Sequence, residues 1–151
     1  MFRGRYEHAV DKKGRTSLPA RFRDVLAEGE APARLVLTNG LDPCVVAYPE
    51  AEWRAFEERL AALPQFDPKV TLLRRYYVSA AVEVEADKMG RVLVPGPLRK
   101  HAGLERGATW AGMGRHVELW ATERFEAEHA RLLGDADQRL AMAQHLAELG
   151  L

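Results

Sequence analysis

The sequence predicts an α+β fold built from two pseudo-symmetric repeats, which are flanked by short helices and followed by C-terminal helices. One phrase occurs twice, as Asp-Lys-Lys-Gly-Arg at residues 11–15 and as Asp-Lys-Met-Gly-Arg at residues 87–91, so its copies lie 76 residues apart. The match continues to Arg23 and Arg99 at the same offset. Repetition at a fixed offset indicates two copies of one supersecondary unit. With 151 residues, 47% of them hydrophobic, the chain can bury one core shared by both halves.

Each copy of the phrase lies between two expected strands. In the first copy these strands are residues 5–10 and 15–18, and in the second they are residues 78–86 and 91–94. Aspartate at the first position and glycine at the fourth fit a type I turn, in which glycine can adopt a positive φ. We therefore expect the first pair of strands to form a hairpin with its lysines at the tip, and the second copy repeats the arrangement.

Short helices follow both return strands, at residues 19–26 and 95–101. Each begins with proline, which is tolerated in the first turn of a helix. Within residues 49–63, apolar side chains recur every three or four positions, which predicts an amphipathic helix. The other expected elements are strands 35–38, 44–48, 109–113 and 116–120, and helices 66–77, 122–133 and 136–149.

The elements group into four segments, namely a first repeat (1–65), a connecting helix (66–80), a second repeat (81–133) and a C-terminal helix (134–151). No low-complexity linker separates the repeats, so we expect the two halves to pack as one unit. The expected core consists of apolar side chains from both repeats: Val10, Leu18, Leu35, Val36, Val45, Trp53, Phe56, Val82, Val94 and Trp120.

Charge is distributed unevenly along the chain, although the formal net charge is zero. Residues 1–24 hold seven Lys and Arg against three Asp and Glu, and residues 117–151 hold three Arg against seven Asp and Glu. This asymmetry predicts a basic face near the start and a solvated acidic C-terminal segment. The alternative is chance scatter on a mixed surface.

The sequence does not indicate an enzyme, a metal site or a membrane protein. A single cysteine, Cys44, cannot form an internal disulfide and fits a reducing cytosol. The five histidines lack metal-ligand spacing, and the Gly-x-Gly at residues 112–114 is too short for a dinucleotide fingerprint, so no metal or cofactor is expected. No apolar run approaches the ~18 residues of a membrane helix, and the N-terminus does not read as a signal peptide.

The repeated turn is the candidate functional site. Asp11 can accept hydrogen bonds from the backbone of its own turn, and Gly14 permits the tight return. Arg15 directly follows this rigid turn, so it loses little conformational entropy when its side chain binds a partner. Such an arginine can pair with guanine O6 and N7 while Lys12 and Lys13 meet phosphates, and a two-stranded ribbon fits the major groove. The alternative is that Asp11 and Arg15 form an ion pair that only stabilises a hairpin.

The opening Met-Phe-Arg-Gly, both repeated phrases, and the segments Tyr48–Trp53 and Val117–Trp120 resemble the MraZ family. The resemblance covers nearly the whole chain and fades after about Leu133. It implies two SpoVT-AbrB-like, swapped-hairpin repeats of β-barrel type. It also implies a bacterial, sequence-specific DNA-binding regulator, assembled as a ring-shaped homo-oligomer. Such a regulator binds short direct repeats upstream of the division and cell-wall gene cluster, as a repressor or, in some lineages, an activator.

Carried over residue by residue, the resemblance implies a set of DNA-binding side chains: Arg3, Arg5, Lys12, Lys13, Arg15, Lys88 and Arg91. It also implies a set that shapes the turns: Asp11, Gly14, Asp87 and Gly90. Met89 stands where the first motif has Lys13, so we expect Arg15 and Lys13 to dominate DNA contact and Arg91 to be auxiliary or structural. The implied partners are double-stranded DNA and further copies of the chain, and the implied location is the cytoplasm, at the nucleoid.

A second class of function is compatible with the same fold. AbrB-type hairpins also occur in protein-interaction and antitoxin-like modules that have no specific DNA target. A tight complex with a protein partner that needs the acidic segment but not Arg15 would favour this class. An enzyme would need a pocket with convergent titratable groups, and the sequence shows none.

Overall fold

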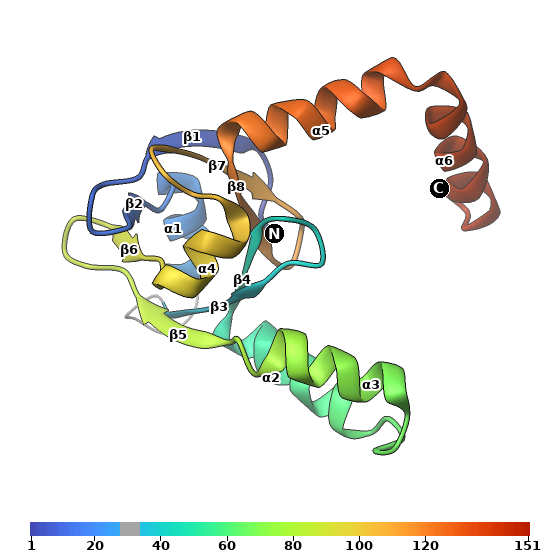
Figure 1. Cartoon of the computed structure of the whole chain (residues 1–151), viewed down its shortest axis with the longest axis horizontal. Helices are drawn as coiled ribbons and strands as arrows, with labels where there is room; N and C mark the ends of the chain where they lie inside the picture. Colours follow the sequence, from blue (N-terminus) through green and yellow to red (C-terminus); the bar gives the residue numbers. More distant parts are fainter. Residues whose placement is uncertain (28–33) are drawn as a thin grey trace. The chain divides into compact units, whose positions relative to one another are not determined.

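The computed structural model describes residues 1–27 and 34–151, and its α+β architecture confirms the predicted fold class (Figure 1). Its strands are β1 (Arg5–Ala9), β2 (Arg15–Ser17), β3 (Arg34–Asn39), β4 (Val45–Pro49), β5 (Val82–Glu85), β6 (Arg91–Leu93), β7 (Gly107–Gly112) and β8 (Val117–Ala121). Its helices are α1 (Ala20–Ala27), α2 (Glu50–Ala61), α3 (Pro68–Leu73), the π-helical η1 (Arg74–Val78), α4 (Gly96–Ala102), α5 (Thr122–Gly134) and α6 (Ala136–Glu148).

Six strands form one antiparallel sheet in the order β1-β7-β8-β4-β3-β5, and β2 pairs with β6 in a separate two-stranded sheet. Exchanging the two repeats converts the six-strand order into its reverse, so the two copies are related by pseudo-two-fold symmetry. β1 and β5 lie at opposite edges of the larger sheet. Both sheets are therefore open, which corrects the expected barrel-type closure.

The two strands that flank each repeated turn pair with strands elsewhere in the fold. β1 pairs with β7, β5 pairs with β3, and the return strands β2 and β6 pair with each other. Among the described residues, one isolated bridge, between Val10 and Thr16, joins the two sides of the first turn. The expected local hairpin is thus wrong. A hairpin with a three-residue return strand would be marginal alone, and pairing β2 with β6 buries Thr16 and Val92 instead.

The core occupies both faces of the larger sheet. Side chains alternate between faces along a strand, so Leu35 and Leu37 join a cluster with α1 and α4, while Val36 joins a second cluster with Trp53 and Tyr77. Eight of the ten expected core residues are buried. Phe56 is half-buried, and Val82 is 41% exposed because β5 is an edge strand.

The connection between the repeats differs from the prediction. The helix expected over residues 66–77 begins at Pro68, because the Asp67 side chain accepts hydrogen bonds from N–H groups of the first turn. Helical structure then continues through η1, so the strand expected from residue 78 begins only at Val82.

The chain divides into two compact units, Met1–Ala121 and Thr122–Leu151. The first contains both repeated turns and all the strands named above. The second contains α5 and α6, and Asp135 caps α6 by accepting a hydrogen bond from the Gln138 N–H at 2.9 Å. No helix in the described part of the chain is long and apolar enough to span a bilayer.

Candidate nucleic-acid interface

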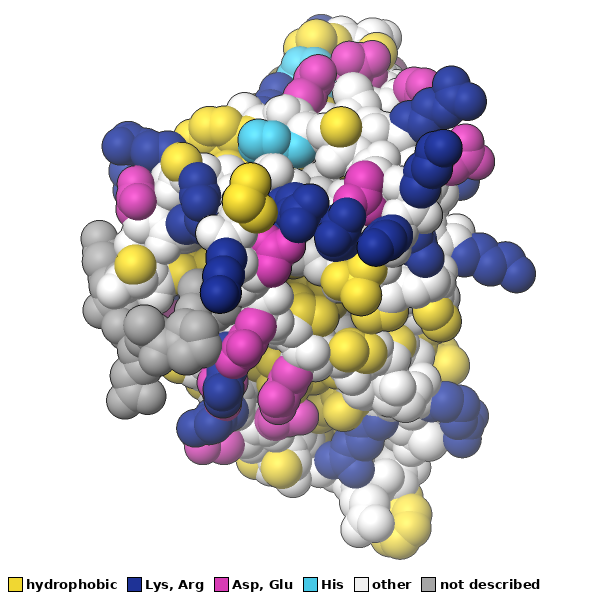
Figure 2. Space-filling view, turned by 90° about the vertical axis from the view of Figure 1, so that its left-hand side faces the viewer, with side chains coloured by type: hydrophobic (Ala, Val, Ile, Leu, Met, Phe, Trp, Pro, Cys, Tyr) yellow, Lys and Arg dark blue, Asp and Glu magenta, His cyan; other side chains and the backbone are white. Residues whose placement is uncertain are grey.

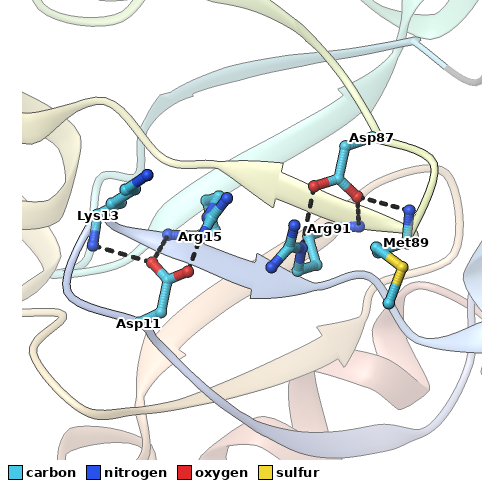
Figure 3. A network of polar contacts seen from close by, with 6 residues as sticks. All are labelled: Asp11, Lys13, Arg15, Asp87, Met89 and Arg91. Carbon is cyan, nitrogen blue, oxygen red and sulfur yellow. Dashed lines mark hydrogen bonds and ion pairs between the residues drawn. The ribbon is translucent and has the colours of Figure 1, made fainter.

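The carboxylate of Asp11 organises the first turn. Its Oδ1 accepts hydrogen bonds from the backbone N–H groups of Lys13 and Arg15, both at 2.9 Å, and its Oδ2 lies 2.7 Å from Nε of Arg15 (Figure 3). The hydrogen bonds of the expected backbone cap and the ion pair of the alternative interpretation are thus both present. Mainly because it accepts the backbone hydrogen bond from Arg15, the pKa of Asp11 is lowered below its ordinary value.

The second turn repeats this geometry. Oδ1 of Asp87 accepts from the N–H groups of Met89 and Arg91 at 2.9 Å, and Oδ2 lies 2.9 Å from Nε of Arg91 (Figure 3). The backbone hydrogen bond from Arg91 is again the main cause that lowers the pKa of Asp87. The second motif therefore keeps the shape of the first while replacing one lysine with methionine.

The fourth position of each turn requires glycine. Gly14 has φ +87° and Gly90 has φ +76°, a left-handed conformation that other residues adopt only with strain. Each glycine N–H closes its turn by donating to the carbonyl of the aspartate, at 2.9 Å in both copies. Both glycines therefore have the positive φ and the closing hydrogen bond that the predicted turns call for.

Pairing of β2 with β6 places the two motif arginines on one two-stranded ribbon. Thr16 pairs with Val92, Arg15 with Leu93, and Arg91 with Ser17. Since side chains alternate along a strand, Thr16 and Val92 point into the core and the two arginines lie on the opposite, solvent-facing side of the ribbon. Two side chains 76 residues apart in the sequence thus share one small surface (Figure 3).

The other basic residues expected to bind DNA lie either in the turns or near the edge strand β1. Lys12, Lys13 and Lys88 are exposed in the turns themselves. Arg5 lies in the edge strand β1, paired with β7, and Arg3 lies just before that strand, so neither is part of the ribbon. On the side where the turns lie in Figure 1, Lys and Arg side chains gather across the surface with Asp and Glu among them (Figure 2).

Arg23 and Arg99 also contact the two turns, although neither belongs to the repeated phrase. Each lies against the glycine of the turn that the opposite repeat contributes: Arg99 against Gly14, and Arg23 against Gly90. The signal that could have found them was the extension of the repeat to both arginines at the same offset.

The described residues offer little for metal binding or nucleophilic catalysis. Among the described residues, no group of three His, Cys, Asp or Glu side chains could hold a metal ion. Cys44 is buried, and burial raises the pKa of its thiol, which makes it a poor nucleophile. Burial lowers the pKa of His116, whose ring stacks on Tyr48, and Tyr48 packs against the second core cluster.

The fold and the site define the class of protein. It is an α+β protein of the AbrB-like type, in which two repeats exchange strands and present their turns at opposite ends of one ribbon (Figure 3). Comparison with known sequences identifies the family within this class. The family model described as "MraZ protein, putative antitoxin-like" matches residues 1–76 and 78–144. The chain belongs to the MraZ family.

Several similar curated proteins share one name. A "Transcriptional regulator MraZ" of Lachnoclostridium phytofermentans is 40% identical over 151 residues, which cover 100% of this chain and 99% of the relative. Relatives of the same name from Heliobacterium modesticaldum and Marinomonas sp. are 46% and 41% identical and cover 83% and 85% of this chain, and 84% and 85% of their own lengths. Transcriptional regulation is a non-enzymatic role, so the family confirms that the chain is not an enzyme.

Proposed function

We propose that this protein is a sequence-specific, double-stranded-DNA-binding transcriptional regulator whose β2–β6 ribbon makes the base contacts. The observation that carries the proposal is the pair of arginines, Arg15 and Arg91, on one solvent-facing side of that ribbon. The name of the curated relatives supports the same function.

The geometry suits direct reading of bases. A two-stranded ribbon fits the major groove, where an arginine can donate two hydrogen bonds to O6 and N7 of guanine. Within each turn the aspartate engages Nε of the arginine, which restricts the side chain and leaves the Nη groups as donors toward a base. Lys12 and Lys13 then meet phosphates, which set position and affinity without reading sequence. We assign the larger share of contact to the first turn, because Met89 replaces a lysine in the second.

Affinity in this proposal comes from several copies of the chain. One ribbon makes few phosphate contacts, so a ring-shaped homo-oligomer that engages short direct repeats gains affinity through effective concentration. The repeats lie upstream of the division and cell-wall gene cluster, where binding of the protein represses transcription. The protein acts in the cytoplasm, at the nucleoid, without a cofactor.

A protein-interaction or antitoxin-like module is the second candidate. The antitoxin-like wording of the family description favours it, and the acidic segment 117–151 offers a surface for a basic partner. In this case the Asp–Arg ion pairs only stabilise the turns.

Fluorescence anisotropy distinguishes the two candidates. The full-length protein is titrated into a duplex from upstream of its own gene and into a scrambled duplex of equal composition, at two salt concentrations. We expect Arg15→Ala to lower the ratio of the two affinities by about tenfold or more, since one bidentate contact discriminates bases by roughly 1–3 kcal/mol. Arg91→Ala should lower it less, and Arg59→Ala, which removes an exposed arginine of α2, should leave it unchanged.

Equal affinity of the wild type for both duplexes would contradict specific DNA binding. Equal preference in the wild type and both ribbon variants would show that the turns are structural. A tight protein complex that survives Arg15→Ala and is lost on neutralising the acidic segment would establish the second candidate.

A further inference from the structure

Each turn glycine is covered by an arginine of the opposite repeat. A Cβ atom on Gly14 would lie 2.0 Å from Nη1 of Arg99, which belongs to α4 in the second repeat. A Cβ atom on Gly90 would lie 2.4 Å from Nη1 of Arg23, which belongs to α1 in the first repeat. Both glycines are buried, although the lysines in the same two turns are exposed. The guanidinium groups are therefore packed directly on the glycine backbones.

The backbone of each turn glycine is also bound by the opposite repeat. The carbonyl of Gly14 accepts a hydrogen bond from the Val94 N–H at 3.0 Å, and the carbonyl of Gly90 accepts one from the Leu18 N–H at 2.9 Å. The opposite repeat therefore adds one backbone contact and one guanidinium contact to the hydrogen bonds that each turn makes within itself. The shape of either turn depends on the other repeat.

An acidic partner does not explain why these two side chains are arginine. Within residues 1–27 and 34–151, no ion pair joins Arg23 or Arg99 to a carboxylate. A planar guanidinium can lie flat against a peptide, whereas the ammonium of lysine is a compact charge on a flexible stem. The contact with the turn glycine is the interaction that favours arginine at both positions.

We propose that Arg99 and Arg23 are positioning residues for DNA recognition, each setting the shape of the turn presented by the opposite repeat. The inference rests on the proposed function, because it takes the turns to be the DNA-contacting elements. Since the first turn carries Lys13 and the second carries Met89, Arg99 governs the stronger contact from within the second repeat. The second repeat thus contributes to recognition by supporting the turn of the first.

The test uses Arg99→Ala, Arg99→Lys and Lys100→Ala in the full-length protein. Lys100 is the matched control, since it is an exposed cation next to Arg99 on the same helix. Anisotropy on the upstream and scrambled duplexes is measured across a range of salt concentrations. We expect Arg99→Ala to lower the ratio of the affinities for the upstream and scrambled duplexes by about tenfold. The slope of log affinity against log salt concentration should not change. Lysine should not restore the preference, and Lys100→Ala should keep the wild-type value.

A double variant tests whether Arg99 acts through the first turn. In the Arg15→Ala background, Arg99→Ala should lower the preference no further, because the side chain that Arg99 positions is already absent. Should Arg99→Ala fail to fold, as judged by circular dichroism, Arg23→Ala replaces it. That variant should show a smaller loss of preference, again with an unchanged salt slope, because Arg23 supports the turn that carries Met89.

Direct phosphate contact by Arg99 predicts different results. A salt slope shallower by about 0.9, restored by Arg99→Lys, would overturn the positioning role. If Arg99→Ala and Lys100→Ala prefer the upstream duplex to the same degree, the positioning role is overturned. The proposed function would still stand in that case, provided that the wild type prefers the upstream duplex. An absence of preference in the wild type would overturn both proposals.

Discussion

Asp11 and Asp87 are the residues on which the shape of the two turns depends. Each carboxylate accepts two backbone hydrogen bonds and one from an arginine side chain. Aspartate followed by lysine and glycine indicated this cap from the sequence, because side-chain capping is local and needs only the turn itself. The roles of Arg23 and Arg99 were not predictable in this way, since their contacts join opposite repeats.

Acid should destabilise the protein through these two carboxylates. Their pKa values are lowered below 3.8 in the folded state, so the unfolded chain binds the protons first as pH falls. The stabilisation is complete above the pKa of the carboxyl in the unfolded chain, and it is lost as pH falls through the pKa in the folded state.

Thermal melts of the wild type and of Asp11→Asn, with Asp24→Asn as the control, measure how stability depends on pH. We expect the melting temperature of Asp11→Asn to fall less than that of the wild type below about pH 4. An equal decline in all three proteins would contradict the assignment.

The ribbon is the element that local sequence patterns did not predict. Periodicity and turn chemistry correctly indicated short strands beside each turn, but they cannot distinguish a local hairpin from an exchanged one. The choice depends on pairing between β2 and β6, and a three-residue strand carries too little pattern to specify its partner. The repeated phrases did indicate the exchange indirectly, because the family that they resemble has swapped hairpins.

The buried pair at the centre of the ribbon gives a stability prediction. Thr16 is 1% exposed, and its hydroxyl makes no hydrogen bond within the described chain, whereas Val92 directly opposite is fully buried and apolar. A buried polar group without a partner costs about 1–3 kcal/mol. We expect Thr16→Val to raise the free energy of unfolding by about 1 kcal/mol and Val92→Thr to lower it by at least as much.

Denaturant titration at fixed protein concentration measures both variants, and DNA preference serves as the control, since neither side chain faces the solvent side of the ribbon. A loss of stability in Thr16→Val would show that the hydroxyl has a partner, for example a buried water.

At the scale of the whole molecule, DNA affinity in the proposed function is a property of the homo-oligomer rather than of one chain. Each added subunit that engages a repeat should neutralise further phosphates, and each phosphate contact contributes about −0.9 to the log–log slope of affinity against salt. We expect the slope to steepen on duplexes that carry one, two and three repeats. Size-exclusion chromatography with light scattering gives the number of chains bound to each duplex. A slope independent of the number of repeats would contradict the multivalent model.

The central claim is that Arg15 reads guanine from the ribbon, and the most direct measurement replaces the atom it would contact. In the upstream duplex, single guanines are changed to 7-deazaguanine, which removes the N7 acceptor, and the affinities of the wild type and Arg15→Ala are compared. We expect at least one guanine at which the change weakens DNA binding by the wild type but not by Arg15→Ala, because the two changes remove the same contact. Equal weakening of both proteins at every guanine, or no weakening of either, would contradict it.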